Sequence, residues 1–206
     1  MPWWMRNCEN LDKALYEGVG RFNIPEIAPV LLDKCDFIGF NQAKRCPNPG
    51  DLGVHFFLDD YQFFRVWTGV ELYMPMLENF KCVCTPDFSL FTDFPLAVQI
   101  YNHYRKHWLG RYWQEHGLTV VPSISWSDEK SFDWCFDGEP VGGAVAISSV
   151  GTQMDNESRY LFNLGYTEMM ARLKPSTIFF HGTIPSWCYG NIVPIQAHQA
   201  KLRELR

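Results

Sequence analysis

The sequence contains no apolar run long enough to cross a bilayer, and its N-terminus has no basic segment leading into an apolar stretch. A spanning helix needs about 20 mainly apolar residues, and a secretory leader needs a basic start before its apolar core. These absences argue against a membrane protein and against export. Apolar residues still make up 47% of the 206 residues, which is enough for a substantial core. We expect one globular domain over residues 1–206 that stays in the cytoplasm.

Paired cysteine motifs are also missing. The seven cysteines are an odd number spread along the chain, and no two of them form a C-x-x-C pair. This usage argues against a disulfide framework and fits a reducing compartment. Cys82 and Cys84 should point to the same face of a strand, but a second pair of zinc ligands is absent. We interpret them as buried free thiols and expect no metal there.

An excess of positive charge is absent. The net charge is −5 and the isoelectric point is about 5.6. Proteins that hold nucleic acid over a wide face are usually basic, so this balance disfavours an extended nucleic-acid surface while allowing a pocket with a local basic rim. Residues 104–107 with Arg111, and the tail 201–206, could supply such a rim. Solvated helix faces are the alternative interpretation of both.

Motifs for common cofactor and hydrolase sites are missing too. The chain has no G-x-G-x-x-G or Walker sequence, which leaves nucleotide-cofactor binding without support. It has no G-x-S-x-G elbow and no H-E-x-x-H zinc helix. His181 stands alone at the end of a predicted strand, and we interpret it as a core residue. We expect no bound cofactor, with Mg²⁺ as the alternative.

Short apolar segments alternate with helical ones along the chain. The helix signal is clearest over residues 95–116, where apolar residues recur every three to four positions, and further helices are predicted over 157–173 and 66–79. The polar stretch 41–53 is predicted to be a loop. Such alternation indicates an α/β fold with a largely parallel sheet, and we favour an incomplete or barrel-like arrangement. The predicted strands are 37–40, 55–58, 81–84, 118–121, 144–147 and 177–180.

Polar residues gather where these strands end. In parallel α/β folds the C-terminal ends of the strands share one edge, where ligands bind. We therefore expect the polar groups to surround one common mouth. They are Asn41, Asp59, Asp60, Tyr61, Asp87, Ser89, Ser125, Trp126, Ser148, Ser149, Gly151 and His181.

Three carboxylates are the predicted catalytic groups. Asp59 and Asp60 are adjacent in an extended segment, so only one of them should enter the mouth, and we favour Asp60 with Asp59 as its orienting partner. Asp87 follows Pro86, which should fix the loop that carries it. For each carboxylate, helix capping or ordinary turn chemistry is the alternative role. Asn102 and Arg105 are predicted to touch substrate backbone or hold the Asp87 loop, and a structural ion pair is the alternative for Arg105.

Aromatic residues form 16% of the chain, and several fall in the loops. Flat apolar walls and a few polar groups suit a nucleobase taken out of its stack, and Tyr61 and Trp126 are the predicted walls. Core packing is the alternative for each ring. Ser148 and Gly151 end a strand with small groups that would let backbone N–H groups approach an anion.

Residues 55–182 resemble the family catalogued as domain of unknown function 4417, which occurs in phages, plasmids and bacteria. The likeness rests on FFLDDYQFFRVW (56–67), TPDFSLFTDFP (85–95), QIYNHYRKHWLGRYWQEHG (99–117), VVPSISWSDEKSFDWCFDG (120–138) and AVAISSVG (144–151). The resemblance implies mobile-element biology, including conflict between phage and host. We expect residues 1–54 and 183–206 to pack on the family-like core. A looser likeness, at fold level, is to barrel enzymes of the tRNA-guanine transglycosylase type.

Three functions fit these residues. The leading hypothesis is a DNA glycosylase, a hydrolase that excises a modified base flipped into the mouth, in phage defence or counter-defence. The second is a Mg²⁺-dependent phosphodiesterase in which Asp59, Asp60, Asp87 and Asp137 gather around the ion. The third is a module that binds a nucleotide or a partner protein without turnover.

Overall fold

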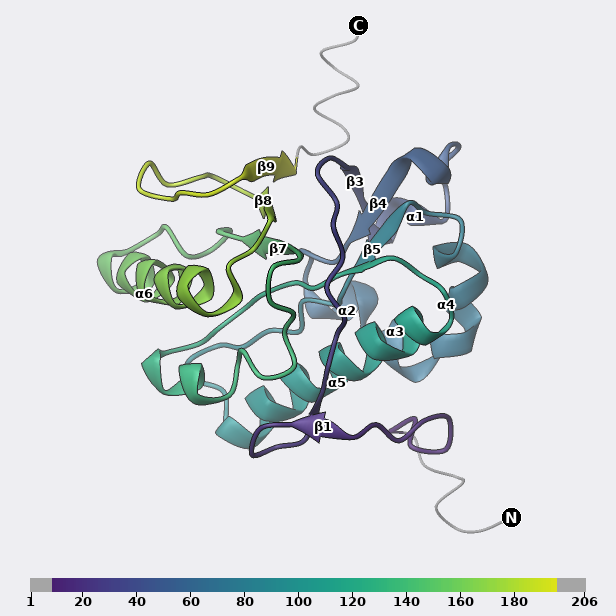
Figure 1. Cartoon of the computed structure of the whole chain (residues 1–206), viewed down its shortest axis with the longest axis horizontal. Helices are drawn as coiled ribbons and strands as arrows, with labels where there is room; N and C mark the ends of the chain where they lie inside the picture. Colours follow the sequence, from purple (N-terminus) through teal and green to yellow (C-terminus); the bar gives the residue numbers. More distant parts are fainter. Residues whose placement is uncertain (1–8, 196–206) are drawn as a thin grey trace, which may run out of the picture.

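Two parallel sheets form the centre of the computed structural model, which describes residues 9–195 (Figure 1). The first has the order β3 (Asp36–Gly39), β4 (Leu52–His55), β5 (Cys82–Cys84) and β6 (Val120–Val121), and the second has β7 (Ala144–Ser148), β8 (Thr177–His181) and β9 (Ile192–Ile195). A parallel bridge between Ser123 and Ala146 joins them, supported by two 2.8 Å backbone hydrogen bonds. The predicted α/β fold with a largely parallel sheet is confirmed.

The strands curve until the two ends of this arrangement face each other. Phe37 on β3 packs edge-on against Phe179 on β8, with ring centroids 5.0 Å apart. His55 on β4 lies 5.2 Å from His181 on β8. Within residues 9–195, β3 and β9 are each paired on one side only, so closure into a barrel stays a prediction.

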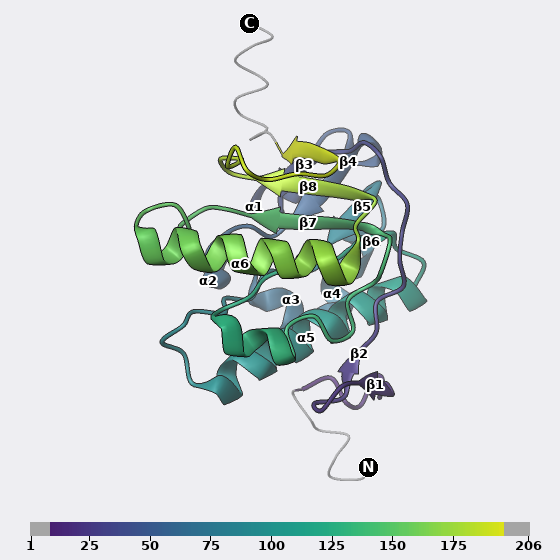
Figure 2. The same ribbon diagram turned by 60° about the vertical axis from the view of Figure 1, so that its left-hand side comes forward.

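Two long helices cover the sheets. Helix α5 (Leu96–Glu115) connects β5 to β6, and α6 (Asn156–Leu173) connects β7 to β8 and runs alongside both strands (Figure 2). Apolar side chains of α6, including Phe162 and Tyr166, form one buried cluster with β7 and β8. Among the helices of the described part, none is both long and apolar enough to cross a membrane. The shorter elements are β1 (Gly18–Val19), β2 (Ile24–Pro25), α1 (Phe40–Ala43), η2 (Pro49–Asp51), α2 (Asp60–Phe63), α3 (Arg65–Thr68), α4 (Val70–Leu77) and η3 (Glu129–Asp133).

The predicted elements differ from the observed ones at several places. The helices predicted over 95–116 and 157–173 are confirmed to within one residue, whereas the one over 66–79 is divided into α3 and α4 at Gly69. Strand β4 starts three residues before the predicted 55–58, inside the predicted loop. A Cβ on Gly53 would lie 2.5 Å from the Phe37 ring and 2.7 Å from Cys82 Sγ, so this glycine allows close strand packing and does not mark a turn.

The prediction that residues 104–107 form a solvated basic face is wrong. Arg105, Lys106 and His107 are buried, with exposed fractions of 6%, 2% and 0%. Helix α5 lies between β2 and the sheet, and its polar side chains find buried partners there. The second predicted basic stretch, 201–206, lies outside the described residues.

Candidate functional site

A cavity of about 640 Å³ opens at the C-terminal ends of β4 to β8, and we call it the mouth. It is built by the loops that follow five successive parallel strands, which is why polar residues far apart in the chain meet there. Eight residues predicted at the site line it: Asp59, Asp87, Ser89, Ser125, Trp126, Ser148, Gly151 and His181. Six others lie outside the lining: Asn41, Asp60, Tyr61, Asn102, Arg105 and Ser149.

The structure places Asp59 in the mouth, whereas the sequence analysis favoured Asp60 there. Asp59 precedes the first turn of α2 in extended conformation and lines the mouth. Asp60 begins α2 and turns away, and its carboxylate accepts hydrogen bonds from the Ser89 hydroxyl at 2.8 Å and from the Ser89 backbone N–H at 3.3 Å. Asp60 therefore holds the neighbouring loop and does not face a ligand in the mouth.

Asp87 lies in the loop after β5 and has an altered acidity. Burial raises the pKa of Asp87 to about 6, opposed by the nearby Lys106 ammonium and by a hydrogen bond from Ser125, while the Asp60 charge raises it further. A carboxyl group that titrates near neutral pH can take up and release a proton under working conditions. Asp87 and Ser125 thus form the polar pair of the mouth with the clearest chemical capacity.

Asn102 and Arg105 hold the loop that carries Asp87, which is one of the two roles predicted for them. Asn102 Nδ2 donates to the Ser89 carbonyl at 2.7 Å, and Arg105 donates to Asn102 Oδ1 at 2.8 Å. The Arg105 guanidinium also stacks over the Phe88 ring at 3.7 Å from its centroid. Both side chains are buried and act on the mouth through the loop.

The aromatic wall differs from the predicted one. Trp126 lines the mouth together with Phe57, Phe91 and Phe162, and its indole N–H donates to the Leu161 carbonyl at 3.1 Å. Tyr61 does not line it and is 78% exposed, because it points outward from α2. One of the two predicted aromatic walls is therefore in place.

His181 lines the mouth, as expected for a polar residue at a strand end, although no catalytic or binding role is predicted for it from the sequence. His181 Nδ1 and the Ser148 hydroxyl are hydrogen-bonded at 3.1 Å, and the imidazole stacks on Phe57 with centroids 5.2 Å apart. Burial lowers the pKa of His181, and burial together with His181 lowers the pKa of His55 to about 3. The mouth therefore contains a neutral imidazole next to a serine. Its position directly after an apolar strand was the available signal.

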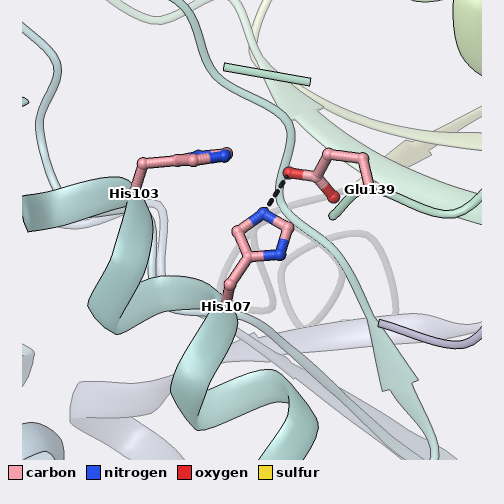
Figure 3. Close-up of side chains that lie close together, drawn as sticks. All are labelled: His103, His107 and Glu139. Carbon is pink, nitrogen blue, oxygen red and sulfur yellow. Dashed lines mark hydrogen bonds and ion pairs between the residues drawn. The ribbon is translucent and has the colours of Figure 1, made fainter. Parts of the chain in front are cut away.

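The sequence interpretation missed a buried cluster of His103, His107 and Glu139 (Figure 3). Among residues 9–195, this is the one set of three or more metal-ligating side chains whose donor atoms come together. The carboxylates of the magnesium alternative do not meet in this way. Asp60 is hydrogen-bonded to Ser89, and Asp137 lies against Gly20 of the N-terminal ribbon, the antiparallel pair of β1 and β2 over residues 18–25.

Comparison with known proteins identifies relatives in phages. The family model described as Domain of unknown function (DUF4417) matches residues 16–198. The Gene 1 protein of Mycobacterium phage L5 is 35% identical over 174 residues, which cover 84% of this chain and 76% of that protein. The Gene 1 protein of Mycobacterium phage D29 is 36% identical over 174 residues, and the chain spans 64% of its length, less than two thirds. No solved structure matches the chain significantly, so the likeness to tRNA-guanine transglycosylases has no support.

Proposed function

The chain belongs to the family described as Domain of unknown function (DUF4417), and we propose that its mouth hydrolyses the N-glycosidic bond of a modified base presented by DNA. The observation that carries the proposal is the Asp87–Ser125 pair in a cavity walled by aromatic rings. The phage relatives support a role in conflict between phage and host. Their name, Gene 1 protein, states no reaction.

The lining of the mouth suits a nucleobase better than a phosphate. Trp126, Phe57 and Phe162 offer flat apolar surfaces, while Ser125, Ser148 and His181 offer hydrogen-bonding groups for a base edge. None of the described lining residues is Lys or Arg. Phosphate contacts would come from outside the cavity, for example from Arg159, whose Nε donates to the Gln153 carbonyl beside the 148–152 loop. A few such contacts suffice for one flipped nucleotide on an acidic protein.

Asp87 is the proposed catalytic residue. Water attacks the sugar carbon C1′, its oxygen forms the new bond, and the bond from C1′ to the base nitrogen breaks. Asp87 accepts the proton of the attacking water, and its carboxylate stabilises the positive charge that develops on the sugar. The leaving base takes up a proton from solvent. Asp59 at the rim would bind the polar edge of the base or a water molecule.

The test is incubation of the full chain with plain and base-modified phage DNA in EDTA, followed by mass spectrometry of released base and alkaline cleavage at abasic sites. We expect released base with an intact backbone before alkali, and loss of release in Asp87→Asn. Asp133→Asn is the matched control because Asp133 is an exposed carboxylate outside the mouth.

Other outcomes separate the alternatives. Strand breaks that require Mg²⁺ and vanish in EDTA would replace the proposal with phosphodiester hydrolysis. Saturable binding of a base or nucleoside with no product from any DNA would replace it with binding alone.

A further inference from the structure

Three buried polar side chains form a cluster away from the mouth. His103 and His107 lie one turn apart on α5, and Glu139 comes from the connection between η3 and β7 (Figure 3). Their exposed fractions are 1%, 0% and 8%. Two imidazoles and a carboxylate are costly to bury unless each polar atom has a partner.

Backbone carbonyls fix the proton on each imidazole. His103 Nε2 lies 3.0 Å from the Asp137 carbonyl oxygen, and His107 Nδ1 lies 2.9 Å from the Pro25 carbonyl oxygen. A carbonyl can only accept, so these two nitrogens carry the N–H groups. The remaining nitrogens, His103 Nδ1 and His107 Nε2, therefore have free lone pairs when the rings are neutral. Metal-binding histidines are oriented in the same way, by a hydrogen bond from the nitrogen that does not bind the metal.

The free lone pair of His107 points toward the Glu139 carboxylate. His107 Nε2 lies 3.0 Å from Glu139 Oε1. Each of the three residues offers one possible metal-ligating atom, and these atoms all lie within 4.8 Å of one another. A neutral nitrogen and a carboxylate oxygen are both acceptors, so this contact needs a proton or a metal cation to be favourable.

Two buried atoms of the cluster also lack a partner within the described residues. They are His103 Nδ1 and Glu139 Oε2. Buried polar atoms are satisfied in the large majority of cases, and an exception indicates a bound group or a water molecule. We propose that His103, His107 and Glu139 bind a divalent transition-metal cation, with Zn²⁺ as the probe. Two imidazole nitrogens and one carboxylate oxygen form a donor set typical of such ions.

Lys106 does not block this site. Its ammonium donates to Glu139 Oε1 at 2.6 Å and to the Ser123 carbonyl at 2.9 Å, which leaves Oε2 for the metal. The positive charge of Lys106 and the ion is offset by carboxylates on either side. Asp87 interacts electrostatically with Lys106, and Asp137 does so with His107.

The ion would act on the fold. Its ligands come from α5 and from the segment before β7, and the carbonyls that orient them belong to β2 and to the turn at Asp137. A bound cation would therefore fasten the N-terminal ribbon and the 134–143 segment to α5. It would also fix Glu139, the partner of Lys106, without entering the mouth.

Zn²⁺ binding by the full chain tests the proposal. The protein is stripped with chelator, titrated with Zn²⁺ against a chromophoric competitor, and its metal content after purification is measured by mass spectrometry. We expect one saturable site and a thermal midpoint that rises on adding Zn²⁺. Even indirect partners of a metal site are worth about 10–100-fold in affinity, so His103→Gln and Glu139→Gln should weaken binding at least about 100-fold. His55→Gln removes a buried imidazole outside the cluster and should bind as the unmodified chain does.

The opposing outcomes are distinct. Absence of saturable Zn²⁺ binding by the unmodified chain, or equal affinity in His103→Gln, would overturn the proposal and leave a buried ion-pair network of Lys106, Glu139 and His107. If the variants do not fold, the metal response of the unmodified chain decides. A thermal midpoint that is the same with and without Zn²⁺ counts against the site.

Discussion

The Asp60 carboxylate accepts a 2.8 Å hydrogen bond from the Ser89 hydroxyl and two longer ones from its backbone N–H. This contact joins the start of α2 to the loop that carries Asp87, over 29 residues of sequence. Asn102 binds the carbonyl of the same Ser89 from α5. The loop is thus held from two sides, and the placement of Asp87 depends on residues that do not themselves line the mouth.

Replacement by alanine should therefore affect the neighbouring residues Asp59 and Asp60 differently. Asp60→Ala removes the hydrogen bonds to Ser89 and should lower the free energy of unfolding by about 1–3 kcal/mol. Asp59→Ala removes an exposed rim carboxylate and should change stability by less than about 0.5 kcal/mol while weakening ligand binding or turnover. Urea unfolding and base-release assays on both variants check this. A larger stability loss in Asp59→Ala would contradict the geometry.

The raised pKa of Asp87 predicts how the stability of the protein depends on pH. Its pKa rises from 3.8 to about 6 on folding because the half-buried carboxyl group loses most of its contact with water. The folded state binds the carboxyl proton of Asp87 more tightly than the unfolded state does. The contribution of Asp87 to stability is therefore most favourable at a pH below its unfolded pKa, and it falls as the pH rises through about 6. Above that, the ionised carboxylate opposes folding by on the order of 2–3 kcal/mol.

Asp87→Asn should remove this penalty. We expect the variant to be more stable than the unmodified chain at about pH 7.5, with a difference that disappears toward pH 4. Base release should be lost at every pH, and in the unmodified chain it should decline on the acidic side of about pH 6 as Asp87 takes up its proton. Chemical unfolding at both pH values is the measurement. A variant that is less stable at neutral pH would contradict the burial argument.

Arg105 is predicted to be a positioning residue. Arg105→Lys keeps the charge but loses the planar group over Phe88 and the donor to Asn102. We expect a stability loss of about 1–2 kcal/mol and a lower kcat with a smaller change in KM, because the loop shifts while the binding walls remain. Arg111→Lys, at a half-exposed site on the same helix, is the control. Equal effects of the two changes would remove the special role of Arg105.

The position of the mouth could be predicted from the sequence because it follows from parallel topology. Strands that run the same way place their C-terminal ends at one edge, so Asp87, Ser125 and Ser148 meet whatever the details of the loops. The direction of Asp59 and Asp60 could not be predicted. It depends on α2 starting at Asp60, a single turn of helix that the apolar pattern does not reveal.

The cluster of His103, His107 and Glu139 could not be predicted because polar residues on a helix are usually expected to face solvent. The apolar spacing predicted the helix over 95–116 but not which of its side chains are buried, since Trp108 is fully buried whereas Leu96 is 57% exposed. The polar residues His103, Lys106 and His107 are also buried. Their nitrogen atoms form hydrogen bonds with carbonyl groups and a carboxylate from distant segments. Partners separated by 30 residues or more in sequence cannot be read from helical periodicity.

Gly165 and Trp126 provide a test of the mouth wall by a double-mutant cycle. A Cβ on Gly165 would lie 2.1 Å from the Trp126 ring, so helix α6 approaches the indole more closely than any other residue type allows. Gly165→Ala should improve helix propensity by about 0.5–1 kcal/mol, but the clash should cost about 1–3 kcal/mol and displace the ring.

The cycle separates these two effects. In a Trp126→Ala background the clash is absent, so Gly165→Ala should be neutral or stabilising there, giving a coupling energy above about 1 kcal/mol. Asn163→Ala, on the exposed face of α6, should stabilise in both backgrounds. Additive effects of Gly165→Ala and Trp126→Ala would mean that the indole does not rest on Gly165. The description of the aromatic wall, and the proposal that the shape of the mouth suits a base, would then have to be revised.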